Sequence, residues 1–324
     1  MGKSEGKSYI NRGLKKVIVF GGAGFIGANI CNELLDKNFL VTSFDNFSSG
    51  NEKNFKNIDN ANFTSIKADI CQKISIKNDF DYIINLACPA SPKYYLSKPI
   101  DTALASTIGV LNILEFTKQN KNSVMLHSST SEVYGDPLVH PQDENYFGNV
   151  NILGPRSCYD ESKRMAETFI YEYSKNYNMN LKIIRIFNTY GPYMNHDDGR
   201  VISNFINQAL VNKNITIYGD GSQTRSFCYI DDLVKGILDY LFLNEINLGP
   251  INLGNPNEMN MNELAEKIIK LTGSNSNIIF EPLPQNDPKV RKPNISRAKQ
   301  LIDFNPSVNL ETGLKKTIKY FSSK

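Results

Sequence analysis

The sequence predicts an α/β fold, in which a doubly wound parallel sheet is followed by a smaller C-terminal α/β lobe. Short apolar runs alternate with stretches of helical periodicity through the first 188 residues, and a glycine-rich turn joins the first run to the first helix. Such runs are typical of strands that are buried on both faces. Strands are expected over residues 15–20, 40–44, 63–66, 82–86, 123–127 and 181–186.

Helical patterns fill the intervals between these strands. After the glycine-rich turn, Ile26, Ile30, Leu34 and Leu35 repeat at the spacing of one helical face. Longer helices are expected over residues 99–118 and 155–173. Because strands and helices alternate in this order, the sheet is expected to be parallel and covered by helices on both faces.

The chain changes character after Asn188. Gly191 and Pro192 interrupt it, and the elements that follow are shorter. We predict a main domain over residues 15–188, a smaller lobe over 189–324, and segments near 228–253 that return to the main domain. Residues 1–14 are polar and are expected to form a loose leader. The later elements are expected at residues 201–210, 215–218, 232–242, 251–253, 261–271 and 310–321.

Composition argues against several classes of protein. The net charge is only +3 and no long basic run occurs, so nucleic acid is not an expected partner. The five cysteines are scattered and include no Cys-x-x-Cys pair, which indicates reduced thiols in a cytoplasmic protein and neither a disulfide framework nor a zinc site. The three histidines show no metal-ligand spacing, and no apolar run is expected to span a bilayer.

The glycine-rich turn predicts a dinucleotide site. Gly21, Gly24 and Gly27 stand between a strand and a helix, where backbone amides and the helix amino end can face a pyrophosphate. Asp45 ends the next strand, where a carboxylate accepts hydrogen bonds from ribose hydroxyls and repels a 2′-phosphate, favouring NAD over NADP. Asp69, after the third strand, suits either an adenine contact or a helix cap.

Tyr159 and Lys163 indicate oxidoreductase chemistry. Their spacing places both side chains on one helical face, one turn apart. Free tyrosine titrates near pH 10, and a neighbouring ammonium lowers that pKa. Tyr159 could then accept a hydroxyl proton while the carbon that bears the hydroxyl loses a hydride. The spacing alone is common, but here it follows a dinucleotide turn and a serine-rich strand end at residues 128–132.

With these features in one chain, the sequence resembles the extended short-chain dehydrogenase/reductase family of nucleotide-sugar enzymes over about residues 15–320. Within that family it is most similar to the branch that converts UDP-glucuronate to UDP-xylose. The Pro-Ala-Ser-Pro loop and the Thr-Ser-Glu triplet are the most specific signals. The stretches that carry the resemblance are residues 86–92, 129–137, 154–161, 185–192, 198–201, 221–225 and 291–293.

The resemblance implies an oxidation that is later reversed. Once C4 of the sugar is a ketone, C6 is the carboxylate of a β-keto acid and can leave as carbon dioxide. Protonation at C5 and return of the hydride to C4 then give UDP-xylose and regenerate NAD. Tyr159 is implied as the base at O4. Lys163 is implied to lower its pKa and to hold the nicotinamide ribose.

Four further residues are implied near the reacting carbons. Thr130 is expected to hydrogen-bond O4, with a helix cap as the alternative. Glu132 is expected beside C5 and C6, and three roles stay open: orienting a water, repelling the substrate carboxylate, or shuttling a proton. Arg291 is expected to assist protonation at C5 or to hold the carboxylate, with an exposed loop arginine as the alternative. Ser131 replaces the aspartic acid that protonates the leaving hydroxyl in the related 4,6-dehydratases.

Ser131 therefore disfavours the main alternative, a nucleotide-sugar 4,6-dehydratase, and the triplet does not resemble that of the 4-epimerases. A sensor that binds NAD without catalysis is a third hypothesis, but it would not need Thr130, Tyr159 and Lys163 together. The implied cofactor contacts are Gly21, Gly24, Phe25, Ile26, Gly27, Asp45, Asn46, Asp69, Ile70, Leu86, Ala87, Thr107, Tyr159 and Lys163.

The resemblance also implies contacts with the nucleotide sugar and a homodimer. Arginine forks suit a diphosphate. The dimer would form through an antiparallel four-helix bundle of residues 99–118 and 155–173. The apolar face of the first helix, which includes Ile100, Leu104, Ile108, Leu111 and Leu114, would equally suit packing on the sheet. The implied substrate contacts are Pro89, Arg156, Asn188, Arg200, Tyr218, Arg225 and Arg291.

Overall fold

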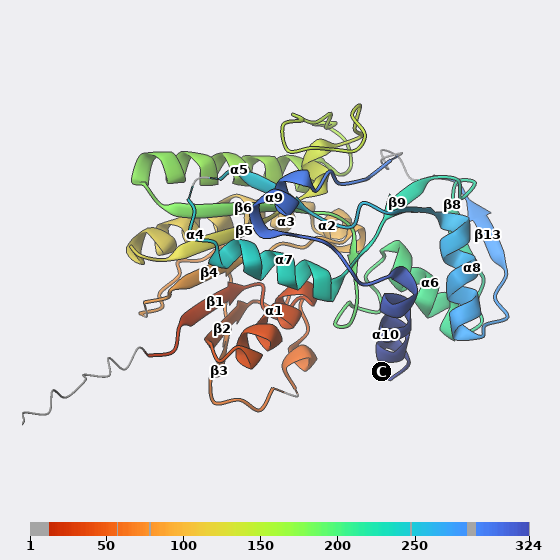
Figure 1. The fold of residues 1–324 in the computed structure, drawn as a ribbon, viewed down its shortest axis with the longest axis horizontal. Coiled ribbons are helices and arrows are strands. Elements are labelled where there is room, and N and C mark those ends of the chain that lie inside the picture. Colours follow the sequence, from red (N-terminus) through yellow and green to blue (C-terminus); the bar gives the residue numbers. More distant parts are fainter. Residues whose placement is uncertain (1–12, 57, 78, 247, 284–289, 324) are drawn as a thin grey trace, which may run out of the picture.

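The predicted apolar runs form the strands of one parallel sheet (Figure 1). The computed structural model describes residues 13–56, 58–77, 79–246, 248–283 and 290–323. Within these residues all seven strands of the main sheet pair in parallel, and the strand order reverses between β4 and β1. Across the sheet the strands are β11 (Pro250–Leu253), β6 (Asn180–Ile186), β5 (Val124–Thr130), β4 (Tyr82–Asn85), β1 (Lys16–Phe20), β2 (Leu40–Asp45) and β3 (Phe63–Lys67).

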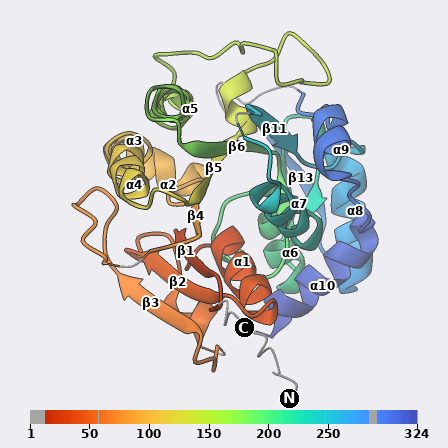
Figure 2. The ribbon, with the colours of Figure 1, turned by 60° about the vertical axis from the view of Figure 1, so that its left-hand side comes forward.

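Helices cover both faces of this sheet (Figure 2). On β1, Val17 and Val19 point into one apolar core and Ile18 and Phe20 into the other, as the alternation of a strand requires. The first core is closed by α1 (Phe25–Asp36) and α7 (Ile230–Phe242), and the second by α4 (Ile108–Gln119) and α5 (Ser157–Tyr177). The predicted Rossmann-type doubly wound sheet is therefore confirmed.

The predicted helix over residues 99–118 is two helices. α3 (Pro99–Ser106) and α4 meet at Thr107, whose backbone leaves regular helical geometry at φ −116° and ψ −78°. The Thr107 hydroxyl donates to the carbonyl of Ala103 at 2.7 Å. A short helix before them, α2 (Pro92–Ser97), was not expected from the sequence. The helix of Tyr159 begins at Ser157 and extends to Tyr177, where Asn178 takes a left-handed conformation.

The sequence predicts no apolar run that could span a bilayer, and this prediction needs correction. The stretch Pro99–Gln119 is long and apolar enough to cross a bilayer by length and composition, with a mean hydropathy of 1.2. Half of this stretch is buried within the fold, where α4 packs on the sheet. Its apolar residues are therefore accounted for in large part by the core.

A smaller lobe extends from the main sheet (Figure 1). There α6 (Val201–Leu210), α8 (Met261–Thr272) and α10 (Leu310–Ser322) surround the parallel pair β8 (Ile215–Tyr218) and β13 (Ile278–Glu281). The chain returns to the main sheet in α7 and β11, and β11 pairs with β6. The residue that divides the two lobes stays a prediction. The remaining elements are η1 (Glu52–Phe55), η2 (Ser131–Tyr134), β7 (Thr189–Tyr190), β9 (Thr224–Ser226), β10 (Cys228–Tyr229), β12 (Glu258–Asn260) and α9 (Ser296–Ile302).

The predicted leader, residues 1–14, lies outside the described residues except for Gly13 and Leu14.

Candidate active site

A cavity of about 1070 Å³ opens at the carboxyl ends of the main strands and is closed on its far side by the smaller lobe. Its walls include the glycine turn after β1, the end of β5, the first turns of α5, and residues 186–205. The carboxyl edge of a parallel sheet, at the point where the strand order reverses, is where such folds bind ligands.

The glycine turn fits a pyrophosphate. Gly21 has φ +79°, and a Cβ on Gly27 would lie 2.2 Å from the carbonyl oxygen of Gly21, so both positions require glycine. Gly24 caps α1 without a side-chain hydrogen bond, so no side chain of the cap occupies the first amides of the helix. Phe25, Ile26 and Gly27 in that first turn line the cavity. An anionic group placed there would meet amides and the positive end of α1.

Asp45 lies beside the turn and is buried. Its carboxylate accepts hydrogen bonds from the backbone amides of Ala23 at 2.9 Å and Phe47 at 2.7 Å. Ala23 lines the cavity, so the carboxylate is fixed directly behind the wall. Each of its oxygens keeps a second lone pair for a ribose hydroxyl.

The other predicted cofactor residues divide into two groups. Leu86 lines the cavity, and Ala87 packs against Gly21 just outside it. Asn46 and Asp69 lie farther along the edge of the sheet, where the Asn46 amide donates to Asp69 at 3.1 Å. Asp69 also accepts from the amide of Cys71 at 2.8 Å, but no helix begins there, so the helix cap that was its alternative role is not formed. Ile70 and Thr107 also lie outside the cavity walls, and the ligand contacts of these outer residues stay predictions.

Tyr159 and Lys163 meet at the cavity, as their helical spacing predicts, and both are buried. The Tyr159 ring stacks on Tyr95 of α2, with centroids 5.1 Å apart. The Lys163 ammonium lies 5.9 Å from the centre of the Tyr159 ring and donates to the carbonyl of Ser128 at 2.9 Å. The Thr130 hydroxyl hydrogen-bonds Tyr159 and also accepts from the amide of Glu132 at 3.2 Å. Thr130 thus caps η2, which was its alternative role, and it also contacts Tyr159.

The expected lowering of the Tyr159 pKa is wrong, because its pKa is raised in this structure. Burial raises the pKa of Tyr159 well above its usual value, and the neighbouring Cys88 adds to the effect. The Lys163 ammonium is turned to the Ser128 carbonyl, and burial lowers its own pKa. A positive charge placed near the phenol would act in the opposite direction and favour the phenolate.

Glu132 is held between two arginines. Arg156 reaches its carboxylate at 2.6 Å and Arg291 at 2.9 Å. Arg291 also donates to Ser131 at 2.8 Å and to the carbonyl of Gly135 at 3.2 Å. With only 2% of its surface exposed, Arg291 is not the exposed loop arginine that was its alternative. Burial opposes ionisation of Glu132, but Arg291 and Arg156 outweigh it and lower its pKa to about 2.

This pKa bears on the three roles left open for Glu132. A carboxyl group that titrates near pH 2 is ionised at neutral pH and carries no proton to shuttle in this state. With two guanidinium groups and one carboxylate, the cluster of Arg156, Arg291 and Glu132 has a net charge of +1. We therefore expect this cluster to attract a substrate carboxylate and not to repel it.

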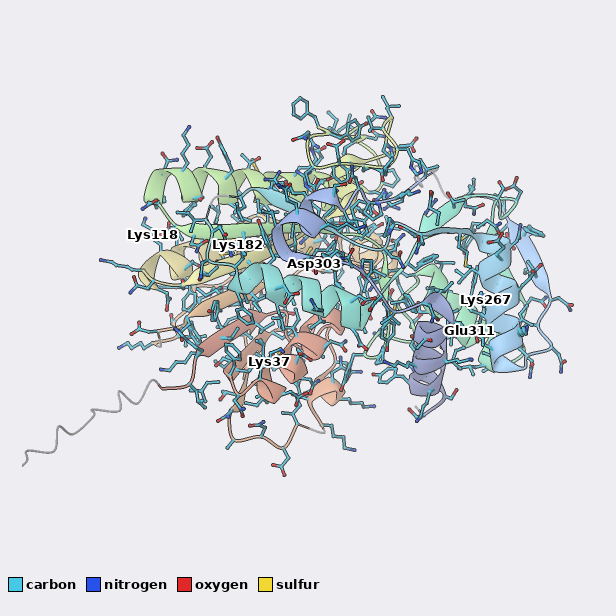
Figure 3. The ribbon with its side chains drawn as sticks, in the orientation of Figure 1. Lys37, Lys118, Lys182, Lys267, Asp303 and Glu311 are labelled. Atoms are coloured by element: carbon cyan, nitrogen blue, oxygen red, sulfur yellow. The ribbon has the colours of Figure 1, made fainter. Side chains whose placement is uncertain are left out.

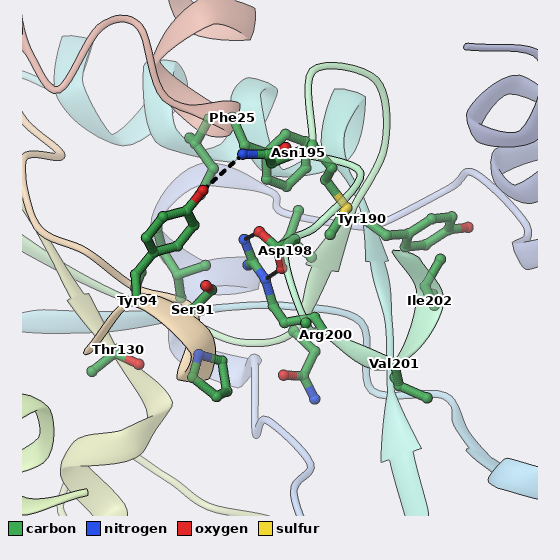
Figure 4. Close-up of a pocket in the computed structure, with 18 of the residues that line it drawn as sticks. Phe25, Ser91, Tyr94, Thr130, Tyr190, Asn195, Asp198, Arg200, Val201 and Ile202 are labelled. Atoms are coloured by element: carbon green, nitrogen blue, oxygen red, sulfur yellow. Dashed lines mark hydrogen bonds and ion pairs between the residues drawn. The ribbon is translucent and has the colours of Figure 1, made fainter. Parts of the chain in front are cut away.

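The substrate side of the cavity holds Asn188, Arg200, Tyr218 and Arg225. Asp198 binds Arg200 through both carboxylate oxygens, and the amide of Asn195 donates to the Tyr94 hydroxyl at 2.9 Å (Figure 4). Pro89 is outside the cavity wall, between Cys88 and Ala90, which line it.

Three residues of the site were not proposed from the sequence. Tyr95 supports the Tyr159 ring, Asp198 orients Arg200, and Asp160 is buried beside Arg156. Asp198 lies in one of the stretches that carry the family resemblance, which was the available signal. The position of Tyr95 depends on α2, which the sequence did not reveal.

A doubly wound sheet with a dinucleotide turn and a buried Tyr–Lys pair at one cavity defines an NAD-linked oxidoreductase of the extended short-chain type. Residues 17–254 match the model of the NAD dependent epimerase/dehydratase family, and the chain belongs to that family.

Its curated relatives specify the branch. UDP-glucuronic acid decarboxylase 1 of Danio rerio is 47% identical over 312 residues, which cover 95% of this chain and 73% of the relative. UDP-glucuronic acid decarboxylase 3 of Arabidopsis thaliana is 45% identical over 302 residues, or 92% of this chain and 86% of the relative. The chain is thus similar to UDP-glucuronic acid decarboxylases over nearly its whole length.

Solved structures of the same fold bind NAD. UDP-glucuronic acid 4-epimerase from Bacillus cereus, in complex with UDP-glucuronic acid and NAD, matches with a TM-score of 0.87 and 28% identity over 95% of this chain and 99% of that one. The dTDP-glucose 4,6-dehydratase from Bacillus anthracis, in complex with NAD, matches with a TM-score of 0.84 and 26% identity, over 95% and 97% of the two chains.

Proposed function

We propose that this protein decarboxylates UDP-glucuronate to UDP-xylose with NAD as a cofactor that is regenerated in each cycle. The observation that carries the proposal is Ser131, which stands beside Glu132 and accepts a hydrogen bond from Arg291. A serine has no acidic proton at neutral pH, so this position cannot assist the loss of water from C6. The adjacent pair of arginines suits a substrate whose C6 is a carboxylate.

NAD, when bound, would supply the acceptor for the hydride that leaves C4 of the sugar and the donor for its return to the same carbon. The glycine turn and Asp45 are the residues that would hold its pyrophosphate and ribose. Tyr159 takes the proton from O4 and later gives it back. Thr130 donates to the same oxygen while it carries negative charge, and Lys163 stabilises the phenolate.

The cluster of Arg156, Arg291 and Glu132 acts on the other end of the sugar ring. Its net positive charge holds the C6 carboxylate in place next to the C4 ketone. Carbon dioxide leaves, its bonding electrons pass into the C4–C5 enolate, and a proton added at C5 restores the ketone. Loss of the carboxylate as carbon dioxide thus consumes one proton for each turnover.

The alternative function is 4-epimerisation of the same substrate, because a UDP-glucuronic acid 4-epimerase shares the fold. An epimerase must turn the keto-sugar within the site before the hydride returns. Arg156 and Arg291 on the carboxylate, with Arg200 and Arg225 on the side expected for the diphosphate, would oppose that rotation.

The test is to incubate the purified protein and NAD separately with UDP-glucuronate, UDP-glucose and dTDP-glucose, and to identify products by mass spectrometry. We expect only UDP-glucuronate to react, with loss of the mass of carbon dioxide. A product of unchanged mass would indicate epimerisation, and loss of water from dTDP-glucose would indicate a dehydratase. Either result would refute the proposal.

The homodimer and the cytoplasmic location are also proposals. Ile100, Leu104 and Ile108 recur along one side of α3 and α4, and 73%, 42% and 44% of their surfaces are exposed. Leu114 on the same pair of helices is fully buried, so the outer apolar row is separate from the core. Because α5 lies beside α3, these helices offer a surface for a second copy (Figure 2). The five free cysteines are consistent with a reducing compartment.

A further inference from the structure

Asp160 is a buried carboxyl group that the mechanism above does not use. It follows Tyr159 on α5, and only 7% of its surface is exposed. Its Oδ1 has no hydrogen-bond partner among the residues that the structure describes, and its Oδ2 lies 4.0 Å from Nε of Arg156. A buried carboxylate oxygen without a hydrogen-bond partner is costly when the group is charged, so that charge must be balanced nearby or removed by a proton.

Arg156 connects Asp160 to the cavity. Its guanidinium group lies between two carboxyl groups, with Nη2 at 2.6 Å from Glu132 and Nε at 4.0 Å from Asp160. The same group lies over the Tyr95 ring, 5.8 Å from its centre. Arg156 and Glu132 line the cavity and Asp160 does not, so Asp160 can influence a ligand only through its neighbours.

The charged groups that face Asp160 come from three segments. Glu132 approaches from η2, Arg291 from the segment after β13, and Arg156 from the start of α5, while the adjacent Glu161 has the smallest influence of these charged groups on Asp160. Burial, reinforced by Glu132, raises the pKa of Asp160 to about 7, although the two arginines act in the opposite direction. Asp160 and the cluster of Arg156, Arg291 and Glu132 together therefore change from a net charge of +1 to zero as Asp160 ionises near neutral pH.

We propose that Asp160 is a positioning residue that couples proton uptake to the binding of the substrate's C6 carboxylate at Arg156. This inference rests on the proposed function, because it requires a uronate in the cavity. When the sugar carboxylate reaches Arg156, three negative groups compete for two guanidinium groups. Asp160 then accepts a proton from solvent, forming an O–H bond on its carboxylate, and Arg156 is left to the substrate.

The direction of the effect follows from the charges. A carboxylate that arrives beside Asp160 raises its pKa further, so at pH 8, where free Asp160 is mostly ionised, binding takes up close to one proton. The affinity for UDP-glucuronate then falls as the pH rises above 7, by up to tenfold for each pH unit. UDP-xylose has no carboxylate, so its affinity should not change for this reason.

The test is isothermal titration calorimetry of the NAD-loaded Tyr159→Phe variant, which is expected to bind without turnover. Titrations at pH 8 in two buffers of different ionisation enthalpy give the number of protons taken up. We expect close to one proton with UDP-glucuronate and none with UDP-xylose. In Asp160→Asn, uptake should be lost and the affinity for UDP-glucuronate should become constant between pH 6.5 and 8.5. Glu161→Gln removes the neighbouring carboxylate on α5 and should behave as the parent does.

The results distinguish the role of Asp160 from the proposed reaction. Binding of UDP-glucuronate without proton uptake, equal uptake with UDP-xylose, or uptake that persists in Asp160→Asn would overturn the role of Asp160 and leave the proposed reaction standing. Binding of UDP-xylose but not of UDP-glucuronate would overturn both. The comparison of the two ligands needs no change at Asp160, so the proposal stays falsifiable even if Asp160→Asn does not fold.

Discussion

At the scale of single residues, burial decides how the site can work. Tyr159, Lys163 and Arg291 are all within the interior, and each keeps its position through contacts to a different element. The pKa of Tyr159 is raised and not lowered as its role as a base requires, because burial favours its neutral form. The nearby Lys163 is a charge that opposes this preference, and bound NAD would add a second positive charge in its nicotinamide ring.

Replacing Tyr159 with phenylalanine removes the base and keeps the ring that stacks on Tyr95. We expect turnover of UDP-glucuronate to fall by about a thousandfold, the usual scale for loss of a positioned acid–base group, while NAD still binds. Steady-state kinetics and a titration with NAD measure the two effects. Tyr95→Phe keeps the same stack and is the matched control. Unchanged rates in Tyr159→Phe would show that another group takes the proton.

Glu132 gives a pH-dependent contribution to stability. Because its pKa in the folded protein is about 2 and the unfolded value is 4.5, the contribution is fully present above pH 4.5 and is lost as the pH falls towards 2. Its upper limit is on the order of 3 kcal/mol. The free energy of unfolding of Glu132→Gln should lie below that of the parent at pH 6, and the difference should shrink by pH 3. A difference that does not change with pH would contradict the ion-pair assignment.

At the scale of elements, local patterns predicted most of the strands and helices. The glycine turn and the Tyr–Lys pair were accessible because each lies within one turn or one helical face. The contact between Glu132 and Arg291 could not be predicted from the sequence, because 159 positions separate the two residues and only the fold brings them together. The division at Thr107 was missed because Thr107 itself is neither proline nor glycine, and its hydroxyl bonds a helix carbonyl as it could within a continuous helix.

The burial of Asp160 also could not be predicted from the sequence. Asp160 and Glu161 are consecutive acidic residues on α5, but their side chains point in different directions around the helix. Glu161 is partly exposed and pairs with Arg164, whereas Asp160 faces the arginines of the cavity. The sequence does not tell which of two adjacent carboxylates faces inward unless the neighbouring elements are placed.

The carboxyl end of α7 depends on a buried lysine of β6. Lys182 donates to the carbonyl of Tyr240 at 2.8 Å and also to those of Leu241 and Leu243 (Figure 3). These carbonyls belong to the last turn and the C-cap of α7, where, among the residues that the structure describes, only the Tyr240 carbonyl also accepts a bond from a backbone amide, that of Leu243 at 3.4 Å, and a cation stabilises such carbonyls. Lys182→Met should lower the free energy of unfolding by about 2 kcal/mol, since it leaves several buried acceptors without donors.

Chemical denaturation of Lys182→Met gives that difference. Lys235→Met is the control on the same helix, where an exposed ion pair with Asp239 is worth well under 1 kcal/mol. We expect kcat of the folded Lys182→Met protein to match that of the parent. Equal stability of the two variants would show that Lys182 does not cap α7.

At the scale of the whole molecule, the cavity lies where the main sheet faces the smaller lobe, and the helices α3, α4 and α5 form a flank that covers one face of the sheet. The exposed row of Ile100, Leu104 and Ile108 is on that flank. A surface of this kind is expected to be covered by a second copy. The candidate catalytic residues Thr130, Tyr159 and Lys163 lie together in one chain, so we expect the proposed dimer to stabilise the enzyme and not to supply these groups.

The double variant Ile100→Glu, Leu104→Glu places two charges on the proposed interface. We expect it to run as a monomer in size-exclusion chromatography with light scattering at a concentration where the parent is a dimer. Ile152→Glu, at an exposed apolar residue in the loop before α5, is the matched control and should leave the mass unchanged. A parent that is already monomeric would rule out the interface.

The most direct test of the proposed reaction follows a single carbon. UDP-glucuronate labelled with ¹³C at C6 is incubated with the protein and NAD in D₂O and observed by NMR. We predict that the label appears as carbon dioxide and bicarbonate, while the nucleotide sugar becomes UDP-xylose with deuterium at C5. Label that stays in the sugar, either in unchanged UDP-glucuronate or in its C4 epimer, would contradict it.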